Sequence, residues 1–222
     1  MFDGLGFTCC GVLILIIVII AFFSKQIYRS NETTIYKKLI ICTTIGLLLD
    51  ILCTITTVYR NFFGIFNVIV LKSYLVYLIS WLYLFTIYAR EISKKNETKL
   101  DLFFLKFMLI ISVICVYILP ISLVVKETGK VRYTTGMSVY FTYIISFIYI
   151  LLIVFYTLSN LKKIKSKKYI PIFAFALIGS LAAYIQFTKP ELLLMTFVES
   201  YIVLIMFFTI ENPDVKMLNE LY

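Results

Sequence analysis

The sequence contains no histidine and few charged residues, and each shortage excludes a class of function. Without histidine the chain has no imidazole for a metal site or for a Ser/His or Cys/His nucleophile. It also has no glycine-rich nucleotide-binding motif. We therefore expect no catalytic residue, no metal and no cofactor in these 222 residues.

Charged residues make up 15% of the chain and hydrophobic residues 62%, and the mean hydropathy is +0.99. A water-soluble fold with this composition would lack the polar surface to cover itself. The apolar runs are near-continuous and about 20 residues long, which suits helices that cross a bilayer rather than the alternating strands of a membrane barrel. The composition thus indicates an integral membrane protein whose main partner is the lipid bilayer, with no nucleic acid bound.

The order of apolar runs and polar interruptions predicts an all-α fold with seven transmembrane helices. They form one domain over 1–210, followed by the start of a cytoplasmic helix over 211–222. The N-terminal segment lacks the basic residues of a cleavable signal peptide, so we expect the first span to be retained. The expected spans are 9–24, 38–58, 68–89, 102–125, 136–158, 169–188 and 191–210.

Basic residues, which give the chain a formal charge of +9, concentrate in the loops after the first, third and fifth spans. Because cytoplasmic loops of membrane proteins carry an excess of Lys and Arg, the N-terminus is expected outside and the C-terminus in the cytoplasm. The basic residues of these three loops are Lys25, Arg29, Lys37 and Lys38; Arg90, Lys94, Lys95 and Lys99; and Lys162, Lys163, Lys165, Lys167 and Lys168.

Tyrosine, phenylalanine and cysteine are placed where packing explains them more simply than ligand binding does. The aromatic residues of the third and fifth spans are expected in helix packing and in interfacial belts. A second interpretation is that they line a site for an apolar or cationic ligand. The cysteines all fall in or beside apolar runs and are expected to be small buried hydrophobes.

Ionisable side chains inside a membrane are rare and often functional, because each is costly unless it is paired or hydrated. Asp50 and Glu199 are expected at similar depths in the outer half of the second and seventh spans. Lys72 and Gln186 are expected near the outer ends of their spans. We hypothesise that these four residues form a polar cluster that receives a small ligand or a proton. The alternative is that they only fix the packing of the helices.

The seventh span is followed directly by signals for a new helix. Asn212 is a suitable N-cap, Pro213 fits the first helical position, and Asp214 suits the positive end of the helix dipole. The segment Glu211-Asn212-Pro213-Asp214 is therefore expected to connect the last span to a cytoplasmic helix.

This segment resembles the exit from the multi-span sensor region of membrane histidine kinases of Gram-positive bacteria, where a similar "ENPD" sequence opens the helix that leads to the dimerisation and phosphoacceptor domain. The resemblance implies a sensory input module in a bacterial plasma membrane, a homodimer formed through the output helix, and a response regulator as a partner of domains beyond this segment. Because these 222 residues include no histidine, they cannot contain the phosphoacceptor.

Three other functions fit the composition. The same input module could precede a cyclic-dinucleotide synthase. A small substrate-capture subunit of a vitamin importer would also be aromatic-rich and would use Asp50 and Glu199 in a deep binding site. In a membrane scaffold, the buried charges would serve assembly only.

Overall fold

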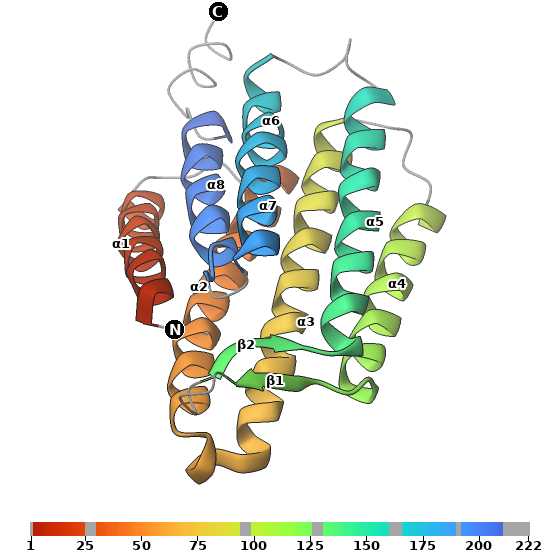
Figure 1. The fold of residues 1–222 in the computed structure, drawn as a ribbon. Coiled ribbons are helices and arrows are strands. Elements are labelled where there is room, and N and C mark those ends of the chain that lie inside the picture. Colours follow the sequence, from red (N-terminus) through yellow and green to blue (C-terminus); the bar gives the residue numbers. More distant parts are fainter. Residues whose placement is uncertain are drawn as a thin grey trace, which may run out of the picture.

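Helices account for most of the residues described by the computed structural model, which are 2–24, 30–93, 99–125, 131–159, 166–189 and 192–210. The all-α class is thereby confirmed, with one short β-hairpin added (Figure 1). The helices are α1 (Phe2–Ser24), α2 (Asn31–Val58), α3 (Arg60–Ile92), α4 (Lys99–Ile118), α5 (Met137–Ser159), α6 (Ile170–Ala174), α7 (Ser180–Thr188) and α8 (Met195–Ile210).

Helices α1 to α5 are each long and apolar enough to cross a membrane, as the composition predicted. Two further apolar helices, Ile170–Gln186 and Met195–Thr209, are shorter. The first of these runs through α6 and α7 without interruption, because the π-helical turn Phe175–Gly179 joins them. Each expected span thus corresponds to a helix or to a continuous pair of helices.

The expected span 102–125 is wrong at its C-terminal end. Helix α4 stops at Ile118, shortly before Pro120, because proline has no N–H for the helical ladder and disfavours helical backbone in the residue before it. Strand β1 (Ser122–Val125) then pairs antiparallel with β2 (Val131–Thr135), and both strands are rich in the β-branched residues that favour sheets.

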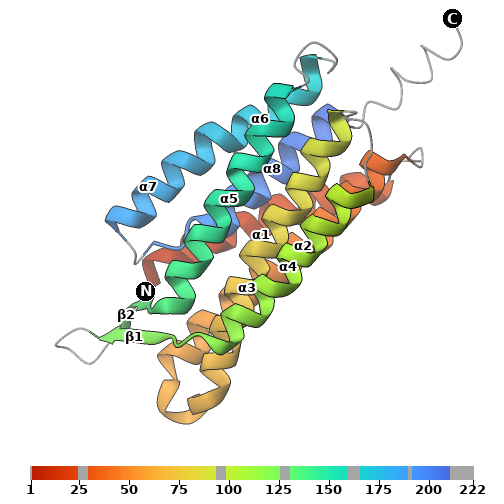
Figure 2. The same cartoon turned by 90° about the vertical axis from the view of Figure 1, so that its right-hand side faces the viewer.

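Helices α2 and α3 are separated by Tyr59 alone and form a long hairpin. Gly64 has φ 42°, which bends the start of α3. Just beyond the bend, Asn67 is buried and its Oδ1 accepts hydrogen bonds from the hydroxyls of Thr56 and Thr57 of α2, at 3.0 and 3.1 Å. The β-hairpin lies toward the same end of the molecule as this turn (Figure 2).

Helix α8 lies between α1 and the α6–α7 helix, and it also contacts α2 (Figure 1). Helix α3 packs against α2, α4 and α5 and carries much of the aromatic core. The five aromatic residues of the expected third span are all buried, so they serve helix packing rather than an interfacial belt; they are Tyr74, Tyr77, Trp81, Tyr83 and Tyr88.

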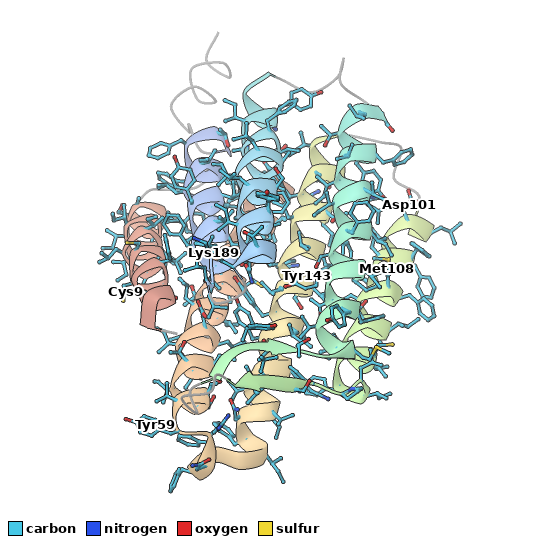
Figure 3. The ribbon with its side chains drawn as sticks, in the orientation of Figure 1. Cys9, Tyr59, Asp101, Met108, Tyr143 and Lys189 are labelled. Atoms are coloured by element: carbon cyan, nitrogen blue, oxygen red, sulfur yellow. The ribbon has the colours of Figure 1, made fainter. Side chains whose placement is uncertain are left out.

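The cysteines are less buried than expected. All five are free, and only Cys53 is buried, while Cys9 and Cys10 are exposed on α1. Cys9 points outward from the bundle (Figure 3). A membrane-facing helix surface accommodates such small apolar side chains as readily as a core does.

Candidate functional site

Asp50 joins three helices through its carboxylate. It lies on α2 and only 1% of it is exposed. Its Oδ2 accepts hydrogen bonds from the hydroxyls of Thr8 on α1, at 2.9 Å, and Thr196 on α8, at 2.8 Å. Its other oxygen, Oδ1, is buried without a hydrogen-bond partner among the described residues. A charged acceptor forms stronger hydrogen bonds than a neutral one, so this contact fixes α1 and α8 against α2.

Glu199 provides a second polar connection, from α8 to α3. It follows Thr196 by three residues, so both side chains lie on one face of α8. It is 2% exposed, and the hydroxyl of Tyr77 on α3 donates a hydrogen bond to its Oε2. One face of α8 is thereby hydrogen-bonded to α2 and α3, and Asp50 of α2 also accepts a hydrogen bond from Thr8 of α1.

Tyr74 lies one helical turn before Tyr77 on α3. It is 7% exposed, and its hydroxyl has no hydrogen-bond partner among the described residues. Its hydroxyl is close enough to both carboxyl groups to interact with them electrostatically, and the two carboxyl groups also interact with each other. We call the six residues Thr8, Asp50, Tyr74, Tyr77, Thr196 and Glu199 the carboxyl cluster.

Two glycines create the space that the cluster needs. A Cβ atom on Gly46 would lie 1.8 Å from Cζ of Tyr77, so the tyrosine ring reaches Glu199 only because α2 has no side chain there. A Cβ atom on Gly11 of α1 would lie 3.1 Å from Cδ2 of Leu47 and 3.3 Å from Oγ of Ser200. Small residues allow such close approach of helices in membranes.

Of the four residues in the predicted polar cluster, the structure brings together only Asp50 and Glu199. The Nζ of Lys72 donates instead to the carbonyl oxygens of Tyr117 and Leu119, at 2.7 and 2.8 Å. Carbonyl groups at the C-terminal end of a helix lack helical partners and attract a cation, which explains why Lys72 binds the end of α4.

Gln186 lies on α7 and does not contact either carboxyl group by a hydrogen bond. It is partly buried, and its Oε1 lacks a partner within the described part of the chain. The neighbours of the two carboxyl groups are instead uncharged hydroxyl side chains, those of Thr8, Thr196, Tyr74 and Tyr77.

The carboxyl cluster contains no lysine or arginine. Neither Asp50 nor Glu199 forms an ion pair with Lys or Arg in the ranges that the structure describes. The same ranges hold no group of three or more His, Cys, Asp and Glu side chains arranged for a metal ion. The cluster can therefore hold protons or a cation and can donate or accept hydrogen bonds, but it offers no activated nucleophile.

A further polar contact lies one turn along α8, toward its C-terminal end. The hydroxyl of Tyr36 on α2 donates to the carbonyl oxygen of Val203 at 3.0 Å, and the Tyr36 ring packs edge-on against Phe22 of α1. The predicted connection to an output helix, Glu211, Asn212, Pro213 and Asp214, lies outside the described residues.

The chain matches no protein-family model, and comparisons with curated proteins and with solved structures gave no match. The carboxyl cluster and the helices that carry it are therefore the features of the chain that bear on its function.

The contact between Gly46 and Tyr77 predicts that Gly46→Ala is destabilising. The new methyl group would displace the Tyr77 ring and break its hydrogen bond to Glu199, at a cost of about 1–3 kcal/mol in the free energy of unfolding. The matched control is Gly6→Ala on α1, where a Cβ atom would meet nothing within 4 Å. Unfolding by a denaturing detergent, followed by circular dichroism, measures both variants. Equal stability of the two variants would contradict this account of the site.

Proposed function

We propose that this chain is the sensory input module of a bacterial membrane signalling protein. In this proposal, a change in the carboxyl cluster shifts α8, and α8 passes the shift to a cytoplasmic output domain. The observation that supports it most strongly is that α8 carries both Thr196 and Glu199, which hydrogen-bond to Asp50 on α2 and to Tyr77 on α3. Asp50 also accepts a hydrogen bond from Thr8 on α1. The same helix leads to the segment 211–214 that resembles a kinase output connection.

The proposed topology has seven spans, with the N-terminus outside. Two basic residues lie near helix ends that meet at one end of the bundle: Arg90 in the last turn of α3 and Lys168 just before α6 (Figure 1). Lys168 forms an ion pair there with Glu32 in the first turn of α2. The positive-inside rule assigns this end to the cytoplasm, and α8 ends on the same side.

The proposed mechanism is a small movement of α8 between two arrangements. A ligand shifts such an equilibrium only by as much as it binds one arrangement better than the other. A proton or ligand that binds at Glu199 or Asp50 would change the hydrogen bonds that hold α8. Helix shifts of about 1–2 Å are typical of such transitions.

The output enzyme that we propose is a two-component histidine kinase, acting as a homodimer on a response regulator. This rests on the resemblance of the segment 211–214, and a cyclic-dinucleotide synthase would use the same input. The transport subunit of a vitamin importer is the rival proposal, because its substrate could also contact Asp50 and Glu199.

The proposal predicts that Glu199→Gln moves the cytoplasmic end of α8. Spin labels placed at Phe208 on α8 and at Leu158 on α5, both exposed, would report the distance between these helices in lipid nanodiscs after the native cysteines are replaced by alanine. We expect the mean distance to change by about 1–2 Å, because the substitution changes the hydrogen bond that joins α8 to Tyr77 of α3.

The matched control for this experiment is Asp101→Asn. Asp101 lies on α4, on the far side of the bundle from α1 (Figure 3), so its substitution should leave the distance unchanged. If Glu199→Gln and Asp50→Asn both gave the distance distribution of the parent protein, the proposed coupling between the cluster and α8 would be refuted.

The output class is tested by sequencing the coding DNA beyond Tyr222. We expect it to continue into a helix with a phosphoacceptor histidine and then an ATP-binding domain. Continuation into a cyclic-dinucleotide synthase domain would keep the sensory function and replace the kinase. A stop codon directly after Tyr222 would contradict both and favour the transport subunit.

A further inference from the structure

Two buried polar atoms of the carboxyl cluster have no hydrogen-bond partner among the described residues: Oδ1 of Asp50 and the hydroxyl of Tyr74. Both side chains are more than nine-tenths buried, and their polar groups are close enough to interact electrostatically. Most buried polar atoms in proteins have a partner, and an exception calls for an explanation such as a bound ion or water. The unpartnered Oδ1 of Asp50, whose Oδ2 accepts from Thr8 and Thr196, points to a bound species at this carboxylate.

The charge of the cluster points to a cation. The titratable groups that face Asp50 are Cys53 and Tyr74, and the cluster's other carboxyl group belongs to Glu199. The groups that face Glu199 are Cys42, Tyr77 and Tyr74, and Tyr143 of α5 faces Tyr74 in turn. All of these groups are neutral or anionic, so no side chain among the described residues that faces the carboxyl pair carries a compensating positive charge. Buried carboxylates need such compensation, above all inside a membrane.

The oxygen atoms near Asp50 are of the kind that coordinates hard cations. Besides the two carboxylate oxygens, the cluster provides the hydroxyl oxygens of Thr8, Thr196 and Tyr74. Each hydroxyl has lone pairs and a hydrogen that rotates, so those of Thr8 and Thr196 can turn from donating to Asp50 to coordinating a cation. The hydroxyl of Tyr74 has no hydrogen-bond partner among the described residues. Oxygen ligands of this kind select hard cations over soft ones.

The number of these ligands favours a monovalent cation. Ca²⁺ takes six to eight oxygens, commonly from several carboxylates, and Mg²⁺ keeps several of its waters. The Asp50 end of the cluster offers one carboxylate and three hydroxyls in an apolar interior. One positive charge beside Asp50 balances that carboxylate and leaves no excess charge there.

We propose that Asp50, Thr8, Thr196 and Tyr74 form a binding site for a small monovalent cation, for which Na⁺ is the probe and with which protons compete. This proposal rests on the proposed sensory function and names the ligand class of the same site. The cation would bind to α1, α2, α3 and α8 at once, so its occupancy would favour the arrangement of α8 in which these helices are held together.

Binding of ²²Na⁺ to the full chain in lipid nanodiscs tests the proposal. The buffer contains N-methyl-D-glucamine as its only other cation. We expect saturable binding of one Na⁺ per chain that weakens as the pH falls, because a proton and Na⁺ compete for the Asp50 carboxylate. Asp50→Asn should abolish the binding, and Tyr74→Phe and Thr196→Val should each weaken it about tenfold, since each removes one oxygen ligand.

Asp101→Asn serves as the matched control and should bind Na⁺ as the parent does. The proposal is overturned if the folded parent protein shows no saturable Na⁺ binding, including the case in which it takes up protons only. It is also overturned if Asp50→Asn binds Na⁺ as the parent does. Should Asp50→Asn fail to fold, unchanged Na⁺ affinity in both Tyr74→Phe and Thr196→Val overturns it.

The result is distinguishable from a failure of the sensory function. Na⁺ binding without any change in the Phe208–Leu158 label distance would leave the cation site standing and refute the coupling to α8. A distance that responds to Glu199→Gln in a protein that binds no Na⁺ would keep the coupling and refute the cation site.

Discussion

A carboxylate buried in an apolar helical bundle is costly unless hydrogen-bond donors reach it, and this requirement governs how α1, α2 and α8 pack. Asp50 meets the requirement with hydroxyls from two other helices, Thr8 and Thr196. Glu199 meets it with the hydroxyl of Tyr77 from α3. The arrangement of four helices therefore depends on two acidic side chains.

In a membrane, these contacts contribute to the association of the helices. Lipid chains are as apolar as leucine, so burial of apolar side chains does little to join helices within a bilayer, and close packing and polar contacts contribute more. The residues around the cluster show both features. Gly11 and Gly46 allow close approach, and the hydroxyls provide the polar contacts. Movement of α8 would change the hydrogen bonds of the cluster, as the proposed sensory function requires.

The sequence predicted the helices well, because long apolar runs leave few alternatives in a membrane. It also identified Asp50 and Glu199, since a carboxylate in such a run is conspicuous. It did not identify their partners. Thr8 lies just before the expected span 9–24, and threonine and tyrosine carry no signal that separates a partner of a carboxylate from an ordinary packing residue.

Which side chains meet depends on the rotation and crossing of the helices, and a period of 3.6 residues does not determine either. Lys72 illustrates the difficulty. Its position suggested a carboxylate partner, but the carbonyl groups at the end of α4 were nearer. The β-hairpin was missed because Pro120 and the β-branched residues after it looked like the end of an apolar span. These residues form strands because two such segments pair with each other.

The most direct measurement of the central claim is a double-mutant cycle between Asp50→Asn and Thr196→Val, with the free energy of unfolding measured in bicelles. The account predicts a coupling energy of about 0.6–1.7 kcal/mol, the range of interhelical hydrogen bonds in membranes. Thr142 of α5 serves as the control partner, because its hydroxyl bonds to its own helix at Ser138, and its cycle with Asp50 should be additive. Additivity between Asp50 and Thr196 would contradict the claim that the carboxylate connects α8 to α2.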